Sequence, residues 1–233
     1  MEPPNLPVAI VADAHIGGPG GPAGPLVEQL EGLARGEPGH LILMGDLFHV
    51  WVGQRTYETV EIRQVVTALS DLRKAGWRID YIEGNRDFFI AEGSYAEVFD
   101  TVADEVSFQV GDRSYLAIHG DGLNEEDRLY QFWRWLSKSA PSRFFMLHLP
   151  GGLAQRLVRV TEGQLSKTNF KHKSRIPREV ISRHAVRRLA QGHDVLLLGH
   201  FHEAQSWQVG DGEVRLLDAW FNTKRVEWLS AEG

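Results

Sequence analysis

Five short, largely apolar runs in this chain are each followed directly by Gly, Asp, Asn or His residues. The apolar runs are 8–12, 41–44, 79–83, 115–118 and 195–198, and the polar clusters are 13–15, 45–46, 84–87, 119–121 and 199–202. Apolar runs of this length predict buried strands. A polar residue at the end of a strand reaches one rim of the sheet, where open α/β sheets bind their ligands. The pattern therefore predicts a site built from several strand ends.

The segments between the first three runs have helical periodicity, which predicts βαβ units and an α/β fold. Helices are expected around Leu26, Leu30 and Leu33 and over residues 59–74. After His119 we expect helices at 125–138, 143–149, 153–160 and 177–190, a basic loop at 167–175, a hairpin of strands 205–209 and 213–217, and a last strand at 225–229. We therefore expect one domain over residues 1–233, with a helical insertion at 123–176 that lies over the site.

The bulk composition restricts the class of protein and its compartment. Hydrophobic residues make up 42% of the chain and charged residues 24%, which is typical of a soluble globular protein. The absence of Cys excludes a disulfide framework, a thiolate zinc site and a cysteine nucleophile, and it suits a reducing cytosol. The first residues do not form a signal peptide, and no apolar run is long enough to cross a bilayer. We expect a cytoplasmic protein.

Basic residues concentrate in one part of the chain. Residues 128–188 hold fourteen Lys or Arg and two acidic residues, whereas the whole chain has a net charge of −6. Such a block suggests a phosphorylated substrate, a lipid headgroup surface or nucleic acid as partner, although many charge runs are only a solvated helical face. The same block contains Phe132, Trp133, Trp135, Phe144, Phe145, Met146, Leu147 and Leu149.

These large apolar side chains suit a lid that contacts a membrane surface or a lipid. They could equally form the core of the helical segment itself. Because they have helical rather than exposed-sheet spacing, we expect no nucleic-acid partner.

The strand ends offer seven oxygen and nitrogen donors, which suit two divalent cations better than one. The donors are Asp13, His15, Asp46, Asn85, His119, His200 and His202. Without thiolates, this set favours Mn²⁺, Mg²⁺, iron or zinc. Asp46 is the expected bridge, with Asp13, His15 and His202 completing one site and Asn85, His119 and His200 the other. A water shared by two cations loses a proton near neutral pH and becomes a nucleophile.

A single one of these motifs would usually be structural, and it is their combination that favours a metal site. The remaining histidines His40, His148, His184 and His193 lack such a setting, so we interpret them as surface or packing residues.

The order Asp-x-His, Gly-Asp, Gly-Asn-x-Asp, His and Gly-His-x-His resembles the calcineurin-like metallophosphoesterase superfamily across the whole chain. This resemblance implies a four-layer αββα sandwich of two mixed sheets. Further motifs resemble the UDP-2,3-diacylglucosamine hydrolase branch of lipid A biosynthesis, whose helical insertion is an acyl-chain lid. They are Gly45-Asp46-Leu47-Phe48 with Trp51, Gly84-Asn85-Arg86-Asp87-Phe88-Phe89, and His119-Gly120-Asp121-Gly122-Leu123 followed by Asp127 and Tyr130.

The resemblance implies a metal-dependent pyrophosphate hydrolase with two divalent ions, Mn²⁺ being the expected metal. Water would attack the α-phosphorus of UDP-2,3-diacylglucosamine and give UMP and 2,3-diacylglucosamine 1-phosphate (lipid X). The protein would act as a peripheral protein on the cytoplasmic face of the inner membrane. Catalysis would involve Asn85, Arg86 and His200, where Arg86 takes the place of a histidine usual in the superfamily, and the substrate contacts carried over are Asn85, Arg86, Asp127, Ser166, Lys173 and His200.

Departures from the branch concern the substrate rather than the metals. Phe170 stands where an Asn is usual, His49 replaces a Glu, and Gln54-Arg55 replaces an acidic pair. Two other functions therefore stay open: a metallophosphoesterase for another nucleotide diphosphate or phosphodiester, and a non-catalytic scaffold. A scaffold would typically lose metal ligands, and none of the seven is lost here.

Overall fold

The computed structural model describes residues 6–123, 128–149, 153 and 176–230. The strands are β1 (Val8–Val11), β2 (His40–Leu43), β3 (Trp51–Val52), β4 (Arg78–Ile82), β5 (Asp87–Phe88), β6 (Thr101–Ala103), β7 (Glu105–Val110), β8 (Arg113–Ile118), β9 (Val195–Leu198), β10 (Gln205–Val209), β11 (Gly212–Leu216) and β12 (Glu227–Leu229). The α-helices are α1 (Gly24–Ala34), α2 (Val60–Lys74), α3 (Arg128–Ser137), α4 (Ala140–His148), α6 (Arg178–Leu189) and α7 (Trp220–Thr223). Short 3-10 turns are η1 (Arg55–Tyr57), η2 (Ala96–Val98) and η3 (Asp121–Leu123).

Within the described residues, the strands form two five-stranded sheets and a two-stranded one. The first sheet has the order β12-β1-β2-β4-β6, the second has the order β10-β11-β9-β8-β7, and β3 pairs with β5. Strands β1, β2 and β4 are parallel neighbours, as are β8 and β9, whereas β12, β10 and β7 pair antiparallel. Both large sheets are therefore mixed, and the carboxyl ends of the parallel strands in each sheet share one edge.

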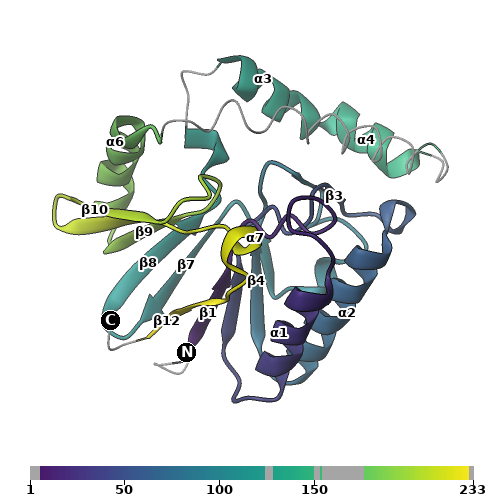
Figure 1. Ribbon diagram of the computed structural model, residues 1–233. Coiled ribbons are helices and arrows are strands. Elements are labelled where there is room, and N and C mark those ends of the chain that lie inside the picture. Colours follow the sequence, from purple (N-terminus) through teal and green to yellow (C-terminus); the bar gives the residue numbers. More distant parts are fainter. Residues whose placement is uncertain (1–5, 124–127, 150–152, 154–175, 231–233) are drawn as a thin grey trace.

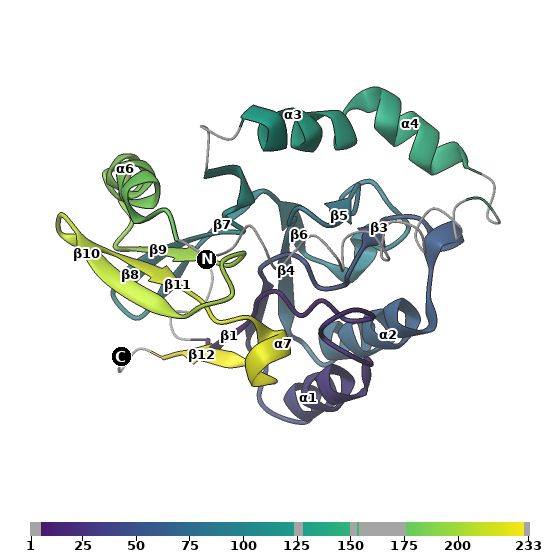
Figure 2. The ribbon, with the colours of Figure 1, turned by 45° about the horizontal axis from the view of Figure 1, so that its top comes forward.

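The two large sheets pack face to face between layers of helices (Figures 1 and 2). On β2, Leu41 and Leu43 pack with α1 and α2, while Ile42 joins the apolar layer between the sheets. This split follows from the alternation of side chains along a strand. Helix α6 covers the outer face of the second sheet through Ile181 and Ala185. The predicted four-layer αββα sandwich of two mixed sheets is confirmed.

The sequence of α2 explains both its start and its orientation. The side chain of Thr59 accepts a hydrogen bond from the Ile62 amide (3.3 Å) and caps the first turn. Apolar residues spaced by three and four place Ile62, Val65, Leu69 and Leu72 on the buried face. The helix therefore packs its apolar face against the first sheet.

His40 has a specific structural role. Its Nε2 lies 2.9 Å from Asp80 Oδ2, and both side chains are buried in the layer between the sheets. The edge of the His40 ring faces the Phe108 ring of the opposite sheet at a centroid distance of 6.0 Å. Of the two sequence-based interpretations of this histidine, packing is confirmed and a surface position is wrong.

The sequence-based prediction of the elements had omissions. It lacked strands β3, β5, β6 and β7, and it placed the last strand over residues 225–229 where β12 covers only Glu227–Leu229. Strand β7 alternates exposed and buried residues on an edge of its sheet, so its apolar signal is weak. The helix predicted at 153–160, apart from residue 153, and the basic loop at 167–175 lie outside the described residues.

Helices α3 and α4 lie across the sandwich, above the site edge of the sheets (Figures 1 and 2). Both fall within the predicted insertion at 123–176: α3 is described from Arg128 to Ser137, with residues 125–127 of the predicted helix outside the described residues, and α4 covers Ala140–His148 where 143–149 was predicted. None of the helices in the described parts of the chain combines the length and apolar character needed to cross a bilayer.

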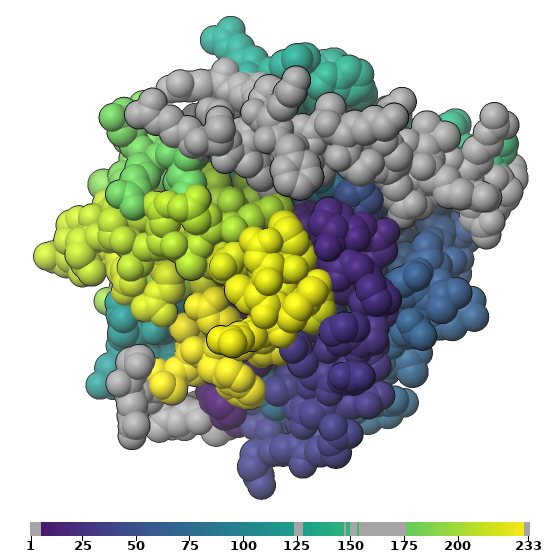
Figure 3. Space-filling view, in the orientation of Figure 1, coloured from purple at the N-terminus to yellow at the C-terminus, as the bar shows by residue number. Residues whose placement is uncertain are grey.

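At the opposite side of the fold β12 pairs with β1, so segments from the two ends of the chain lie side by side (Figure 3).

Candidate metal centre

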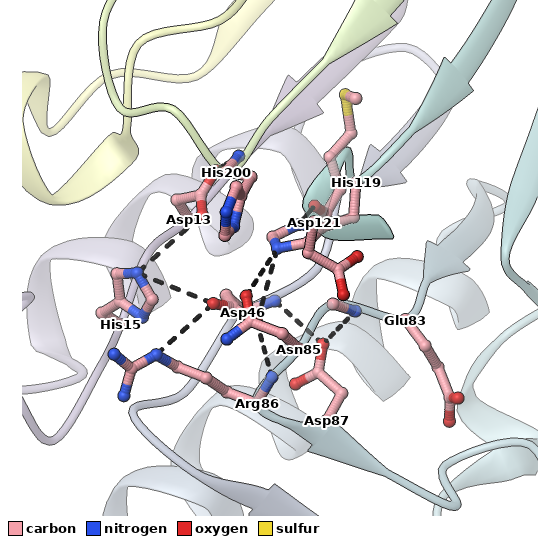
Figure 4. Close-up of polar contacts among 12 residues, drawn as sticks. Asp13, His15, Asp46, Glu83, Asn85, Arg86, Asp87, His119, Asp121 and His200 are labelled. Atoms are coloured by element: carbon pink, nitrogen blue, oxygen red, sulfur yellow. Dashed lines mark hydrogen bonds and ion pairs between the residues drawn. The ribbon is translucent and has the colours of Figure 1, made fainter. Parts of the chain in front are cut away.

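All seven predicted metal ligands come from the strand ends at one edge of the sandwich. The loops after β1, β2 and β4 carry Asp13, His15, Asp46 and Asn85, and the loops after β8 and β9 carry His119, His200 and His202. Each sheet thus contributes part of the set, and Figure 4 shows the side chains of Asp13, His15, Asn85, His119 and His200 gathered around Asp46. This convergence could not be read from any one motif.

The first cluster consists of Asp13, His15 and His202. The Nε2 atoms of the two histidines are 3.2 Å apart, and His202 Nε2 lies 3.1 Å from Asp13 Oδ1. His15 Nε2 is 3.8 Å from the same oxygen and 3.9 Å from Asp46 Oδ2. One ligand atom from each of these three residues lies within 4.8 Å of the others, which is the spacing expected of donors around a single cation.

The second cluster lies on the other side of Asp46. His119 Nε2 is 3.2 Å from Asn85 Oδ1 and 3.7 Å from Asp46 Oδ1. Asp13, Asp46 and His119 also form a group whose ligand atoms lie within 4.8 Å, so Asp13 borders both clusters. The ring of His200 lies against that of His119 at a centroid distance of 5.2 Å.

The hydrogen bonds of His119 define which ring nitrogen faces the cluster. Its Nδ1 lies 2.8 Å from the carbonyl oxygen of Met44, which can only accept. Nδ1 therefore carries the proton, and in the neutral ring the Nε2 lone pair is directed at Asp46 and Asn85. A carbonyl partner of this kind fixes the tautomer of metal-binding histidines.

Five of the seven residues have a left-handed backbone. The φ angles are +50° for Asp13, +45° for His15, +51° for Asp46, +66° for His200 and +60° for His202. This conformation costs L-residues about 1–2 kcal/mol each, somewhat less for short polar side chains. Strain of this kind gathers at functional sites, where the surrounding structure supports it.

Two glycines allow the loops to approach one another closely. Gly45 has a φ of +83°, and a Cβ there would lie 2.7 Å from both the Gly84 amide nitrogen and His119 Nδ1. A Cβ on Gly84 would lie 2.3 Å from Asp46 Oδ1. Any larger residue would push Asp46 or His119 away from its position.

Burial and mutual charge perturb the titration of the cluster. Burial alone would raise the pKa of Asp13, but the hydrogen bond to His202 and the charges of nearby histidines lower it well below its usual range. Burial raises the pKa of Asp46, as does the charge of Asp13. For His119, burial is outweighed by the carboxylates of Asp46, Asp13 and Asp121, which raise its pKa. The negative electrostatic potential of these carboxylates, which favours a proton on His119, also favours the binding of a metal cation between them.

Asp87 supports Asp46 from below, a role that the sequence analysis did not assign. Its Oδ2 accepts hydrogen bonds from the amides of Asp46 and Gly84, both at 2.8 Å. Burial and the charge of Asp46 raise the pKa of Asp87 to about 7. Its position as the last residue of the Gly-Asn-x-Asp motif was the available signal.

Arg86 lies beside Asp46 rather than at the surface. Only 5% of the residue is exposed. Its Nε is 3.5 Å from Asp46 Oδ2, and its Nη1 donates to the His49 carbonyl at 3.1 Å and lies 3.3 Å from His49 Nδ1. The contacts with His49 therefore hold the guanidinium next to the carboxylate of Asp46. From the sequence, His49 was interpreted only as a departure from the branch.

The six residues predicted to contact the substrate divide into three that the structure describes and three that lie outside the described residues. Asp127, Ser166 and Lys173 lie outside the described residues, as does Phe170. Of the predicted contacts, Asn85, Arg86 and His200 are described, and all three come together at the metal centre (Figure 4).

The donor set fits the divalent cations that the sequence predicts. Oxygen and imidazole nitrogen donors without thiolate suit Mn²⁺, Mg²⁺, iron or zinc. Two buried carboxylates face four histidines and an amide oxygen, and a carboxylate shared by two clusters is the arrangement that two-metal hydrolases use. The residues present therefore support divalent metal binding.

Proteins named UDP-2,3-diacylglucosamine hydrolase are similar to this chain. The protein from Pseudomonas entomophila is 30% identical over 175 residues, which cover 72% of each chain. That from Chromohalobacter salexigens is 31% identical over 161 residues, and the match spans 66% of this chain and 65% of the relative. That from Ralstonia nicotianae is 27% identical over 224 residues, covering 92% of this chain and 84% of the relative.

Solved structures are similar at much lower sequence identity. A protein of unknown function from Aquifex aeolicus is 15% identical with a TM-score of 0.48, covering 96% of both chains. An archaeal phosphodiesterase is 12% identical with a TM-score of 0.43, covering 96% of this chain and 99% of that one. No family model matches the chain.

Proposed function

The chain belongs to the UDP-2,3-diacylglucosamine hydrolase family of calcineurin-like metallophosphoesterases, and from this premise we propose that it hydrolyses the pyrophosphate of UDP-2,3-diacylglucosamine. The products would be UMP and 2,3-diacylglucosamine 1-phosphate, within lipid A biosynthesis. The observation that carries the proposal is the cluster of seven nitrogen and oxygen donor residues from both sheets, with the buried carboxylate of Asp46 between its two halves.

The proposed reaction is a displacement at phosphorus. The oxygen of a water molecule forms a bond to the α-phosphorus, and the bond from that phosphorus to the bridging oxygen breaks. The bridging oxygen leaves with the sugar phosphate, and the proton of the water passes to solvent. When bound, two divalent cations, with Mn²⁺ as the expected metal, supply activation of the water and neutralisation of phosphate charge.

The residues of this chain hold and orient the reacting groups. Asp13, His15 and His202 would hold one cation, Asn85, His119 and His200 the other, and Asp46 would contact both. The lowered pKa of Asp13 keeps its carboxylate ionised at neutral pH. The fixed tautomer of His119 presents Nε2 without a rearrangement.

Arg86 is proposed to contact the phosphate that is attacked. Its guanidinium is always charged and offers a planar fork of donors that matches phosphate oxygens. The contacts with His49 hold it beside Asp46. It thus presents a fixed positive charge where negative charge would increase during the reaction.

The insertion at residues 123–176, which contains α3 and α4, is proposed to be a lid that binds the acylated part of the substrate. On the inner side of α4, Met146 and Leu149 pack with Val52 and Tyr57, and the Tyr57 hydroxyl donates to the Met146 carbonyl (2.8 Å). This apolar contact attaches α4 to β3, which pairs with β5 directly after Arg86, and the acyl chains are proposed to bind beside it.

The outer side of the same helices would contact the cytoplasmic face of the inner membrane. Half or more of each of six large apolar side chains there is exposed, namely Leu129, Phe132, Trp133, Trp135, Phe144 and Phe145. Arg128 lies on α3. Aromatic and basic side chains together favour the surface of an anionic bilayer.

The decisive experiment is an assay of UMP release with Mn²⁺ present or removed by chelation. The diacylated sugar nucleotide, its deacylated counterpart and bis-p-nitrophenyl phosphate are compared at equal concentration. We expect Mn²⁺-dependent release that is fastest with the diacylated substrate, because remote binding energy from the acyl chains is used in the transition state. Equal kcat/KM with and without acyl chains would instead favour a metallophosphoesterase for another nucleotide or diester.

A further inference from the structure

One face of α3 is attached to two loops that carry predicted metal ligands. Tyr130 and Arg134 lie on α3 and Lys138 directly follows it, and their spacing of four residues places the three side chains on the same side. The first two contact the loop after β8, and the third contacts the loop after β4. These loops contain His119 and Asn85, which belong to the same proposed cation.

The contact with the first loop is made through Asp121, two residues after His119. The Tyr130 hydroxyl donates to Asp121 Oδ2 at 3.0 Å, and Arg134 Nε donates to the same oxygen at 2.6 Å. Asp121 is buried. A buried carboxylate that accepts from a guanidinium forms a strong and directional pair.

The contact with the second loop is made through backbone. Lys138 Nζ donates to the Gly84 carbonyl at 3.1 Å and lies 3.7 Å from Glu83 Oε2. Gly84 directly precedes Asn85 and also donates to Asp87. The ammonium group therefore holds the peptide that orients the Asn85 side chain.

The attachment of α3 depends on these polar contacts because the helix has little apolar burial. None of its ten residues, all within the described chain, is buried. Leu129, Phe132, Trp133 and Trp135 are exposed, so these four apolar side chains do not anchor it to the sandwich. Because the helix is held mainly through these polar contacts, its position and the positions of the two contacted loops depend on one another.

We propose that Tyr130, Arg134 and Lys138 are positioning residues, which hold His119 and Asn85 at the separation needed to bind the second cation. The inference rests on the proposed two-metal function. In this arrangement α3 holds the two loops that carry these ligands, in addition to its proposed role in the lid. Loss of these contacts would allow the loops that carry His119 and Asn85 to separate. The affinity for the second cation would then fall, while the affinity for the first would not change.

The test uses the full-length protein with Tyr130→Phe, Arg134→Gln and Lys138→Met, singly and combined. Mn²⁺ binding is measured by calorimetry and by electron paramagnetic resonance, which distinguishes a coupled ion pair from a single ion. Arg143→Gln is the matched control, because it removes an ion pair with Glu92 (2.6 Å) that ties α4 to a loop without metal ligands. Lys138→Arg tests rescue by a conservative change.

We expect the second Mn²⁺ to bind roughly 10- to 100-fold more weakly in the combined variant, while the first Mn²⁺, held by Asp13, His15 and His202, binds as in the wild type. The first ion thereby reports that the variant is folded. With bis-p-nitrophenyl phosphate, kcat should fall at low Mn²⁺ and recover at high Mn²⁺, with KM little changed. Arg143→Gln should behave as the wild type and Lys138→Arg should regain most of the affinity.

Two outcomes separate this inference from the proposed function. Wild-type affinity for both ions in Tyr130→Phe and in the combined variant would overturn the positioning role. A wild-type protein that binds no Mn²⁺ would overturn the proposed function itself.

Discussion

Asp46 is the residue on which the site depends most. Its Oδ1 accepts from the Arg86 amide (2.9 Å) and faces His119, while its Oδ2 faces His15 and the Arg86 side chain. The left-handed φ of Asp46 and the amide contact with Asp87 fix this orientation. The two oxygens thus face different clusters.

We predict that Asp46→Asn abolishes turnover and leaves at most one Mn²⁺ bound, because an amide offers one oxygen and no negative charge. Calorimetric titration with Mn²⁺ and the UMP-release assay measure the two effects. Asp71→Asn on the exposed face of α2, where Asp71 pairs with Lys74, is the control and should behave as the wild type. Two tightly bound ions in Asp46→Asn would show that this carboxylate is not shared.

Arg86→Ala should keep both metal ions and lose rate. Removing one preorganised electrostatic contact to a transition state costs roughly 10²- to 10³-fold in kcat. Arg86→Lys should restore only part of the rate, since an ammonium group lacks the planar donor fork. Steady-state kinetics at saturating Mn²⁺ provide the measurement, and a wild-type rate in Arg86→Ala would remove this residue from the proposed mechanism.

Among the elements, β2 and β4 are joined by a buried hydrogen-bonded pair of side chains as well as by their backbone ladder. His40 and Asp80 lie in the layer between the sheets, and Arg78 Nη2 also lies 3.0 Å from Asp80 Oδ2. Burial raises the pKa of Asp80, but the bonds to His40 and Arg78 outweigh it and lower the pKa below its usual value. The pair therefore stabilises the fold only while Asp80 is ionised.

Asp80→Asn should lower the free energy of unfolding by about 1–3 kcal/mol at pH 7, the cost of an imperfectly satisfied buried polar group. Because the pKa of Asp80 is lower in the folded state, this stabilisation is complete above the unfolded value of about 3.9 and is lost as the pH falls through the folded value. The difference between wild type and variant, measured by urea denaturation, should therefore shrink below about pH 4. A constant difference down to pH 2 would contradict the assignment.

The outer face of α3 and α4 gives an element-scale test of membrane contact. Replacing Phe132 and Trp133 by Ser should reduce co-sedimentation with anionic vesicles roughly tenfold or more, since each buried aromatic side chain contributes about 1.5–3 kcal/mol. Trp228→Ser on β12 is the matched control, because Trp228 is 50% exposed on a different part of the fold. Equal loss of binding in all variants would indicate that no particular face docks.

At the scale of the whole molecule, the metal centre connects the two sheets. The first sheet supplies Asp13, His15, Asp46 and Asn85, and the second supplies His119, His200 and His202. The left-handed residues in both sets store strain that folding must offset. A cation shared between the sheets would bind only the folded arrangement and would offset that strain.

Mn²⁺ at 100 times its dissociation constant should add about 2.7 kcal/mol to the stability of the sandwich, which corresponds to a rise in Tm of roughly 5–10 °C for a chain of this size. Thermal unfolding with Mn²⁺ and after chelation measures the effect. Asp46→Asn should show a smaller rise. An unchanged Tm in the wild type would mean that the donors do not bind Mn²⁺ as a set.

The sequence pattern by itself predicted an α/β fold and the identity of the proposed ligands, and the resemblance to the superfamily predicted the four-layer sandwich. Each apolar run that ends in Asp, Asn or His is a local pattern, and parallel strands bring such ends to a common edge. That is why Asp13, Asp46 and His119 could be selected before the structure was known. The aromatic residues at 132–145 could be found in the same way, but not the side of the helix on which they lie.

Only the tertiary structure decided which partners surround these residues. The support of Asp46 by Asp87, the pair of His40 and Asp80, and the attachment of α3 through Asp121 join side chains brought together by folding. Their formation depends on which sheets and helices meet, a property that no single stretch of sequence contains. The left-handed backbone of five ligands has a mixed origin, because Asp and His adopt this conformation more readily than most residues and the neighbouring loops hold it at these positions.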